Sequence, residues 1–434
     1  MKRNVATFSL DTSRYKEIKS KMLNWAHLFS IFLFLDSNEY DLPHSKYECL
    51  LAVGSLSTLD LSSEKDALSA LQQFHDANKD WLFGNICYDL KNKLESKLSS
   101  RHPEKMKFPA IQFFQPQIVC YIEKNKQALT IEAIGQDPNA IFDSINNSSS
   151  IIDNGLPHLQ FEQRINKQDY IATISKLREH IADGDCYEIN FCNEGYCEDV
   201  IVEPIQIFNA INNLSPAPFA AYYHTDGKYM MCSSPERYLQ KTGNRILSQP
   251  IKGTARRDKD VAKDDNIKKD LQNDIKERAE NVMIVDLTRN DLARSCDIGS
   301  VQVEELFGIY TFPQVHQMIS TITGMLRKDI PFTDAIRYSF PMGSMTGAPK
   351  IKVMQLIDAY ESSMRELFSG TVGYISPGGD FDFNVIIRSL FYNTQTKYLS
   401  YQTGGAITYD SVPEKEWEEM RLKAWALERI FSAV

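Results

Sequence analysis

The sequence predicts a mixed helix and strand protein of the α/β (α+β) class, rich in antiparallel hairpins. Two patterns support this prediction. Apolar residues recur at helical spacing in three segments, and short apolar runs separated by glycine-rich or polar turns follow them towards the C-terminus. With 434 residues, of which 43% are hydrophobic and 24% charged, the chain is long enough for one broad core or for more than one.

The N-terminal part contains the most apolar run, residues 28–35 (LFSIFLFL). Its aromatic and β-branched content favours a fully buried strand, and it is far too short to cross a bilayer. Residues 144–150 (SINNSSS) are polar and are expected to form a surface loop. This loop divides the chain into an N-terminal subdomain, residues 1–150, and a larger part, residues 151–434, although strands on both sides could complete a shared sheet.

Helical spacing is clearest after this loop. Apolar residues from Tyr170 to Ile181 predict a helix with Asn166 as its N-cap and Gly184 as its stop. A later helix is expected to begin near Pro349, because proline is favoured at an early helical position.

Between these two helices, residues 267–279 carry an apolar side chain at every fourth position. This spacing predicts a helix that passes into a strand at residues 282–285, with Glu280 at the junction. Further strands are expected at residues 370–376, 385–392 and 398–403.

Composition excludes several classes of function. The formal net charge of −9, without a stripe of lysine and arginine, argues against a nucleic-acid partner. The eight cysteines are scattered, with no C-x-x-C pair and no cluster with histidine at metal-ligand spacing. We therefore expect a reduced, cytoplasmic compartment. We also expect no membrane segment, since the N-terminal residues lack the cleavage region of a signal peptide.

The segment QPIKGTARR, residues 249–257, places Lys252 between an isoleucine and a glycine. A lysine beside apolar residues usually packs its stem and extends its ammonium group to water. Alternatively, the following glycine allows close approach, and the amine is held inward as a reagent. The local sequence leaves both interpretations open.

Three glutamates, Glu236, Glu280 and Glu416, lie at the edges of predicted elements. Taken singly, each is more often a solvated surface residue than a functional one. Carboxylate ligands without a cysteine or histidine site suit a hard cation such as Mg²⁺, which takes one or two carboxylates and keeps water or substrate oxygens.

Anion binding is suggested at two glycine-containing segments. Residues 340–350 (FPMGSMTGAPK) lead into a predicted helix N-terminus, where free N–H groups favour a carboxylate or phosphate, although this is not a Walker A loop. Gly404 and Gly405 could bring bare backbone close to an anion. Arg388 is a lone cation in a predicted apolar strand, equally consistent with an internal salt bridge. His316 is the one histidine in a pattern that could place it in a cleft.

Taken together, these segments resemble the chorismate-utilising enzymes, which include anthranilate synthase component I, aminodeoxychorismate synthase component I and the isochorismate and salicylate synthases. The resemblance runs from about Asp169 to the C-terminus. It rests on motifs that follow one another in order: IADGDCYEINF, SSPERYL, PIKGT, ERAENVMIVDLTRND, GSMTGAPK, GYISPGGDFDFNVIIRS and TGGAITYDSVPEKEWEE. The N-terminal third matches more faintly, through FLDS and WLFGNICYDL. The resemblance implies antiparallel sheets packed as a sandwich with helices outside.

The resemblance also implies roles for individual residues. Glu280 and Glu416 match the two glutamates through which Mg²⁺ holds a substrate carboxylate, and Glu236 matches a general acid or base near the departing C4 hydroxyl. Residues matching the family's substrate-binding positions are Arg388, Ser344, Gly404, Gly405 and Thr254. His316 is included among the candidate catalytic residues.

Lys252 distinguishes branches of the family. Anthranilate synthases carry alanine at this position, whereas PIKGT resembles the aminodeoxychorismate synthases, in which the lysine is thought to attack ring carbon 2 before ammonia attacks carbon 4. Glu188 occupies the position where the water-using relatives carry a different lysine. The implied reaction is amination of chorismate to 4-amino-4-deoxychorismate. Anthranilate synthase component I and a non-catalytic chorismate-binding paralogue are the alternatives.

No glutaminase motif resembling GxCxGxQ is found in the sequence. We therefore expect ammonia from a separate glutamine amidotransferase subunit. Two positions depart from the family pattern: Phe368 stands where a tyrosine is common, and Ala406 replaces a frequent glycine. Either change could alter substrate binding.

Overall fold

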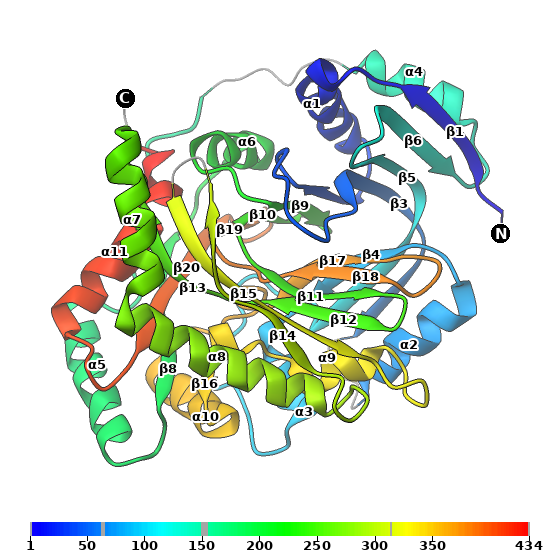
Figure 1. Ribbon diagram of the computed structural model, residues 1–434. Helices are drawn as coiled ribbons and strands as arrows, with labels where there is room; N and C mark the ends of the chain where they lie inside the picture. The colour runs from blue at the N-terminus through cyan, green and yellow to red at the C-terminus, as the bar shows by residue number, and fades with distance from the viewer. Residues whose placement is uncertain (1, 62–65, 149–154, 313–314, 433–434) are drawn as a thin grey trace.

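The computed structural model describes residues 2–61, 66–148, 155–312 and 315–432. Strands occupy the middle of the molecule and helices surround them (Figure 1). The α-helices are α1 Tyr15–Ala26, α2 Ala67–Asn78, α3 Lys91–Leu94, α4 Pro138–Asn146, α5 Lys167–Ala182, α6 Pro204–Leu214, α7 Val261–Asn273, α8 Ile275–Ala293, α9 Thr333–Ser339, α10 Lys350–Tyr360 and α11 Pro413–Arg429. Short 3-10 turns are η1 Thr12–Arg14, η2 Tyr88–Leu90 and η3 Gly343–Met345.

The strands of the described residues form one hydrogen-bonded network in which every pair is antiparallel. They are β1 Asn4–Ser9, β2 Ile31–Asp36, β3 Tyr47–Leu61, β4 Leu82–Ile86, β5 Ile111–Glu123, β6 Ala128–Ala133, β7 Glu162–Gln163, β8 Glu188–Cys197, β9 Phe219–Thr225, β10 Lys228–Ser234, β11 Arg237–Thr242, β12 Arg245–Gln249, β13 Ile251–Arg256, β14 Gln302–Thr311, β15 Val315–Met325, β16 Gly347–Ala348, β17 Thr371–Ile375, β18 Phe381–Asn384, β19 Ser389–Asn393 and β20 Tyr398–Ile407. The predicted class, with antiparallel sheets and external helices, is confirmed.

Two long strands, β3 and β5, connect the two layers of this network. On one side, β3 pairs with β2, and the network continues through β9, β10, β19 and β20 to β8. On the other side, β5 pairs with β4, and the network continues through β17, β18, β11 and β12 to β15, which pairs with both β13 and β14. The pairing between β3 and β5 is interrupted at Ser55 and Ser57. Gly54 lies just before the interruption with φ +65°, a backbone conformation that glycine adopts without strain.

The predicted buried strand at residues 28–35 is observed as β2, which begins at Ile31. Its side chains alternate between two cores. Leu33 belongs to the large core cluster that also contains Phe113 and Phe383, whereas Phe34 belongs to a second cluster with Phe208 and Met22 of the covering helices. This alternation is the geometry of a strand that is buried on both faces.

The predicted helices at α5 and α10 are confirmed. The Asn166 side chain accepts a hydrogen bond from the Asp169 backbone N–H at the start of α5. The strands expected at residues 370–376 and 398–403 correspond to β17 and β20.

The strand predicted at residues 282–285 is wrong, because this run lies inside α8. The side chains of Ile284, Val285, Thr288 and Leu292 are buried at helical spacing. Asp274 begins the helix by accepting a hydrogen bond from the Glu277 backbone N–H. A short apolar run is ambiguous on its own, and here the buried side chains at helical spacing from Asn281 to Leu292 decide it, whereas the helix predicted over residues 267–279 is divided at Asp274 between α7 and α8.

The strand predicted at residues 385–392 begins only at Ser389. Before it, the backbone N–H groups of Val385 and Ile386 donate to the carbonyls of Glu236 and Gly370, and Arg388 has φ +51°. Arg388 is therefore at a bend before β19, and not within a strand.

The polar segment at residues 144–150 is only partly a loop, since α4 ends at Asn146 and Ile145 is fully buried. Ser149 and Ser150 lie outside the described residues. Strands on both sides of this segment pair with each other, β2 with β9 and β4 with β17. The division into residues 1–150 and 151–434 stays a prediction.

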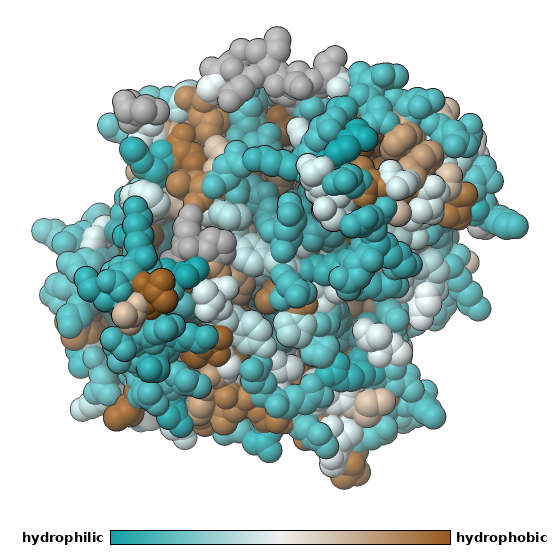
Figure 2. Space-filling model, turned by 45° about the horizontal axis from the view of Figure 1, so that its top comes forward, coloured by the Kyte–Doolittle hydropathy of each residue, from teal (hydrophilic) through white to brown (hydrophobic). Residues whose placement is uncertain are grey.

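Among the residues that the structure describes, no helix combines the length and the apolar character needed to cross a bilayer. Hydrophilic residues cover most of the face in Figure 2, and apolar residues are scattered among them in small groups. All eight cysteines are free and buried.

Candidate active site

Lys252 lies where the two layers of strands approach each other. Its Nζ donates a hydrogen bond of 2.7 Å to Glu188 Oε1 and lies 3.9 Å from Glu280 Oε2. The side chain is only 10% exposed, so the snorkelling interpretation is not what the structure shows. Burial alone lowers the pKa of Lys252, but the carboxylates of Glu188 and Glu280 outweigh it, and the pKa is raised above its usual value.

The backbone at Lys252 leaves the regular ladder. The pairing of β13 with β15 is interrupted between Ile251 and Thr254, and Gly253 has φ +85°. A side chain at Gly253 would meet Glu277 and Leu271 of the adjacent helices. The glycine thus allows both the local backbone turn and the close packing of α7 and α8 beside the lysine.

Glu236 is buried in the stretch between β10 and β11. Its Oε1 accepts a hydrogen bond of 2.7 Å from Ser344 Oγ. Burial raises the pKa of Glu236 to about 7, against the opposing effects of the Ser344 hydrogen bond and the Lys252 charge. A carboxyl group that titrates near neutral pH can act as a proton donor or acceptor.

The loop carrying Ser344 is held by residues that sequence reasoning missed. Asn190 Nδ2 donates to the Ser344 carbonyl, and the Arg365 guanidinium donates to the carbonyls of Met345 and Asn190. Glu361, four residues before Arg365, forms a buried ion pair with it at 2.6 Å. These are buried polar groups that satisfy one another, and together they fix Ser344 beside Glu236.

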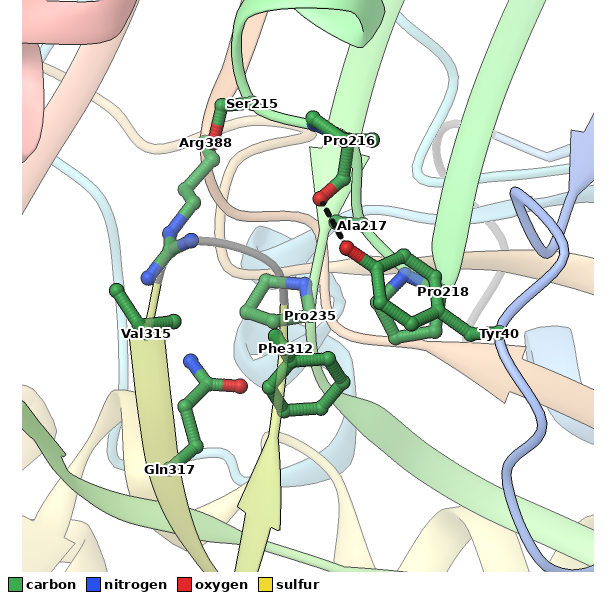
Figure 3. A pocket seen from close by; sticks show the side chains of 10 residues that line it. All are labelled: Tyr40, Ser215, Pro216, Ala217, Pro218, Pro235, Phe312, Val315, Gln317 and Arg388. Carbon is green, nitrogen blue, oxygen red and sulfur yellow. Dashed lines mark hydrogen bonds between the residues drawn. The ribbon is translucent and has the colours of Figure 1, made fainter. Parts of the chain in front are cut away.

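Arg388 enters a pocket next to Glu236. Figure 3 shows its guanidinium and the Gln317 amide directed into the same space, which Pro235 and Tyr40 also line. Within the described parts of the chain, the guanidinium has no hydrogen bond or ion pair. Burial lowers the pKa of Arg388, and Tyr40 and Glu236 only partly oppose this effect. The internal salt bridge considered from sequence is therefore not found there, and the guanidinium is available to a ligand anion.

Gly404 and Gly405 lie in β20, opposite Cys192 and Phe191 of β8. A side chain at Gly404 would collide with the Phe191 carbonyl, at 2.1 Å, so close approach of the two strands requires glycine. A side chain at Gly405 would instead point at two carboxylates of α11, with Glu416 Oε2 at 3.4 Å and Glu419 Oε1 at 3.5 Å.

Of these two carboxylates, Glu416 is buried and Glu419 is exposed. Burial raises the pKa of Glu416, whereas the Lys423 ammonium at 2.8 Å lowers that of Glu419. The positive charge of Lys252 lowers the pKa of Glu419, and the negative charge of Glu419 raises the pKa of Glu280. Glu419, which sequence reasoning did not select, is therefore part of the same cluster.

Oxygen ligands for a hard cation are present here. Burial raises the pKa of Glu280, as it does that of Glu416, so both carboxylates lack full compensation of their negative charge. Among the described residues, no group of three or more metal-type side chains is preassembled. One or two carboxylates nevertheless suffice for Mg²⁺ when water and substrate supply the other ligands.

Two predicted site residues have no side-chain hydrogen bond to this cluster within the described parts of the chain. Thr254 is exposed on β13. His316 is buried on β15, with Nε2 at 3.0 Å from Asp264 Oδ1 and Nδ1 at 3.0 Å from Thr311 Oγ1. Its ring has no hydrogen bond with Lys252 or Glu236, and successive residues of a strand face opposite sides, with Gln317 in the Arg388 pocket. Catalytic participation of His316 stays a prediction.

The site contains a lysine, several carboxyl groups and a guanidinium without an ion-pair partner among the described residues. An unpaired guanidinium is suited to binding a substrate that carries carboxylate groups. The sequence matches the chorismate binding enzyme family over residues 37–429. The chain belongs to this family. It is 40% identical over 273 residues to the aminodeoxychorismate synthase of Streptomyces pristinaespiralis, covering 63% of this chain and 38% of that relative. It is 36% identical over 261 residues to anthranilate synthase component 1 of Aquifex aeolicus, covering 60% and 52%.

The fold of this chorismate binding enzyme is also shared with solved structures. Anthranilate synthase component I from Streptococcus pneumoniae TIGR4 matches with a TM-score of 0.77 at 22% identity, covering 90% of this chain and 93% of that one. By contrast, this chain spans only 38% of the length of the Streptomyces relative.

The two departures from the family pattern have different surroundings. Phe368 is 2% exposed and belongs to the large core cluster, where its ring packs without needing a hydrogen-bond partner. Ala406 lies in β20 opposite Asn190, two residues after Gly404. Neither residue contacts Lys252 or Glu236 through a hydrogen bond.

Proposed function

We propose that this chain is the synthase subunit that converts chorismate and ammonia to 4-amino-4-deoxychorismate in the cytoplasm. The single observation that carries the proposal is the position of Lys252, which is buried within the carboxylate cluster with its amine next to Glu188 and Glu280. A structural lysine in a chorismate-binding site needs no such inward position. Relatives named aminodeoxychorismate synthase and anthranilate synthase both occur among the similar proteins, and Lys252 favours the former.

The proposed reaction uses each group in a separate step. Arg388 and the backbone at Gly405 bind substrate carboxylates. The Lys252 ammonium loses a proton to solvent, and the neutral amine then forms a bond to ring carbon 2 while Glu236 donates its proton to the C4 hydroxyl, which leaves as water. Ammonia then bonds to carbon 4, the bond between Lys252 and carbon 2 breaks, and Glu236 takes the surplus proton from the new ammonium group.

A divalent cation fits this site. Glu280 and a carboxylate of α11 would hold it, and a bound Mg²⁺ would supply positive charge next to a substrate carboxylate. The chain itself provides the other groups used in the proposed reaction, which are Lys252, Glu236 and Arg388.

The decisive experiment identifies the product. The purified chain is incubated with chorismate, an ammonium salt and Mg²⁺, and the product is characterised by mass and ultraviolet spectrum. A product aminated at carbon 4 supports the proposal. Anthranilate indicates anthranilate synthase component I, and the absence of any turnover under these conditions indicates a non-catalytic chorismate-binding protein.

The nitrogen source provides a second prediction. We expect the isolated chain to use ammonium salts but not glutamine, because its sequence has no glutaminase nucleophile motif. Adding a glutamine amidotransferase subunit should allow glutamine to serve as the nitrogen source. Glutamine-dependent turnover by the rigorously purified chain alone would contradict the proposed separate partner.

Glu236 provides a prediction about pH. The reaction needs protonated Glu236 and neutral Lys252, whose pKa is raised, so turnover at saturating ammonia should rise with pH up to the Glu236 pKa of about 7 and level off above it. Ser344→Ala removes a donor that stabilises the carboxylate, which raises this pKa further and moves the point where turnover levels off to higher pH.

The matched control for this pH prediction is Ser248→Ala. It removes a buried hydroxyl that donates to the Tyr238 carbonyl and not to Glu236. The pH profile of this variant should coincide with that of the wild type. A profile that moves to lower pH in Ser344→Ala would contradict the assigned role of Glu236.

A further inference from the structure

Glu188 is the nearest charged neighbour of Lys252. Its side chain is fully buried, and its Oε1 lies 2.7 Å from the Lys252 Nζ. Among the described residues, Oε2 has no hydrogen-bond partner at all. The carboxylate is therefore engaged with the lysine alone, and its burial depends on that one cation.

The backbone that carries Glu188 is held from both sides. On one side, β8 pairs with β20 through Ile189 and Ile407. On the other, Glu188 itself pairs with Ala348 of β16. A side chain at Gly347 would lie 2.0 Å from the Glu188 carbonyl, so the two backbones are in close contact. Glu188 thus projects from a fixed platform.

Lys252 has a less constrained backbone and a long, flexible side chain. It belongs to β13 in the other layer, at the point where the ladder with β15 is interrupted. The other nearby carboxylate, Glu280, is 3.9 Å away and also faces Lys276 at 3.7 Å. Of the two, only Glu188 combines direct hydrogen bonding with a rigid support.

From this geometry we infer that Glu188 is a positioning residue for Lys252, fixing the place from which the amine reaches the substrate. The inference rests on the proposed function, in which that amine attacks carbon 2. A carboxylate on a rigid strand sets the position of the Nζ across the two layers, and misplacement of a reacting atom by about 1 Å can cost about 10²-fold in rate.

Two variants separate position from charge. Glu188→Asp keeps the negative charge but withdraws it by one methylene group, and Glu188→Gln keeps the length but removes the charge. Glu188→Asp should lower kcat by about 10-fold to 10²-fold, with KM for chorismate changed by less than about threefold, whereas Glu188→Gln, which can still accept a hydrogen bond at the same distance, should lose less. The rate at which Lys252 forms a covalent adduct, followed by intact-protein mass without ammonia, should fall by the same factor as kcat.

Glu48→Gln is the matched control. Glu48 is another buried glutamate that accepts a hydrogen bond from a buried lysine, Lys19, but it lies in the N-terminal part. Its replacement should reduce thermal stability without changing the rate of adduct formation. Full kcat in Glu188→Asp would show that charge alone matters and would overturn the positioning role.

Failure of the proposed function has a different signature. In that case the wild-type enzyme itself forms neither an adduct nor a product aminated at carbon 4, and the positioning role falls with it. If the wild type is active and both Glu188 variants match it in kcat and adduct rate, only the positioning role is wrong. Thermal unfolding of each variant shows whether a loss of rate reflects a loss of fold.

Discussion

Replacing Lys252 with arginine should abolish amination of chorismate, with kcat lower by at least about 10³-fold. Guanidinium keeps a positive charge beside Glu188 and Glu280, so the electrostatics of the cluster are largely preserved. It is a poor nucleophile, however, because it stays protonated. The variant thus removes the nucleophile and retains the charge, and turnover with ammonium salts measures the difference.

The same lysine should be trapped chemically in the wild-type enzyme. With chorismate and Mg²⁺ but no ammonia, nothing except slow water can displace the amine from the ring. Intact-protein mass should then increase by chorismate minus one water, and peptide mapping should place the addition on Lys252. If no adduct forms and Lys252→Arg keeps nearly full activity, the lysine has a structural or electrostatic role only.

Lys252→Ala tests the relationship to anthranilate formation. Removing the side chain opens space beside ring carbon 2, where ammonia could attack directly. We expect the main reaction to be lost and traces of product aminated at carbon 2 to form. Product identity by mass and ultraviolet spectrum distinguishes this outcome from residual amination at carbon 4.

The sequence was informative where the chemistry depends on short motifs. Lys252, Glu236, Ser344 and Glu280 were selected from local patterns and the family resemblance. The structure brings Lys252 next to Glu280 and Ser344 next to Glu236, and the Lys252 charge acts on Glu236. The helix α5 could also be predicted, because its cap and its apolar period agree.

Partners across the sheet could not be predicted from these patterns. Glu188 and Lys252 are 64 positions apart and belong to different layers, so only the folded chain shows that they form an ion pair. Arg388 was expected in a strand, but the hydrogen bonds of Val385 and Ile386 to other segments end the regular pairing before it. In each case, tertiary contacts decided what local sequence left open.

The same limit applies to α8 and to the acidic residues near it. Residues 282–285 resemble a strand in isolation, and recognising them as helix requires the buried side chains up to Leu292. Glu419 carries no distinguishing pattern in a chain with 57 acidic residues. Its place near Gly405 becomes visible only when α11 packs against β20.

The metal site leads to the second prediction with a large expected effect. Turnover should require Mg²⁺, and excess chelator should abolish it. Glu280→Gln should lower turnover at a fixed Mg²⁺ concentration by about 10²-fold or more, because one of few carboxylate ligands becomes a neutral amide. Full activity in excess chelator would contradict the proposed metal requirement.

The two carboxylates of α11 can be distinguished by the same assay. Glu416 was selected from the sequence. The structure adds Glu419, whose negative charge raises the pKa of Glu280 and whose own pKa is lowered by the positive charge of Lys252. Both side chains point towards Gly405, so either could complete the site with Glu280. We expect Glu419→Gln to weaken Mg²⁺ binding at least as much as Glu416→Gln, since the Glu419 charge acts on Glu280.

Titration calorimetry with Mg²⁺ provides a measurement that does not depend on turnover. The wild-type chain is compared with Glu280→Gln, Glu416→Gln and Glu419→Gln in the absence of chorismate, so that no adduct forms during the titration. Glu428→Gln is the control on the same helix, because Glu428 pairs with Arg421 and lies outside the cluster. Weakened binding in Glu280→Gln and in one α11 variant, with Glu428→Gln unchanged, identifies the pair that holds the cation. Unchanged binding in all of the cluster variants would place the cation elsewhere, since a neutral amide binds a hard divalent ion more weakly than the carboxylate that it replaces.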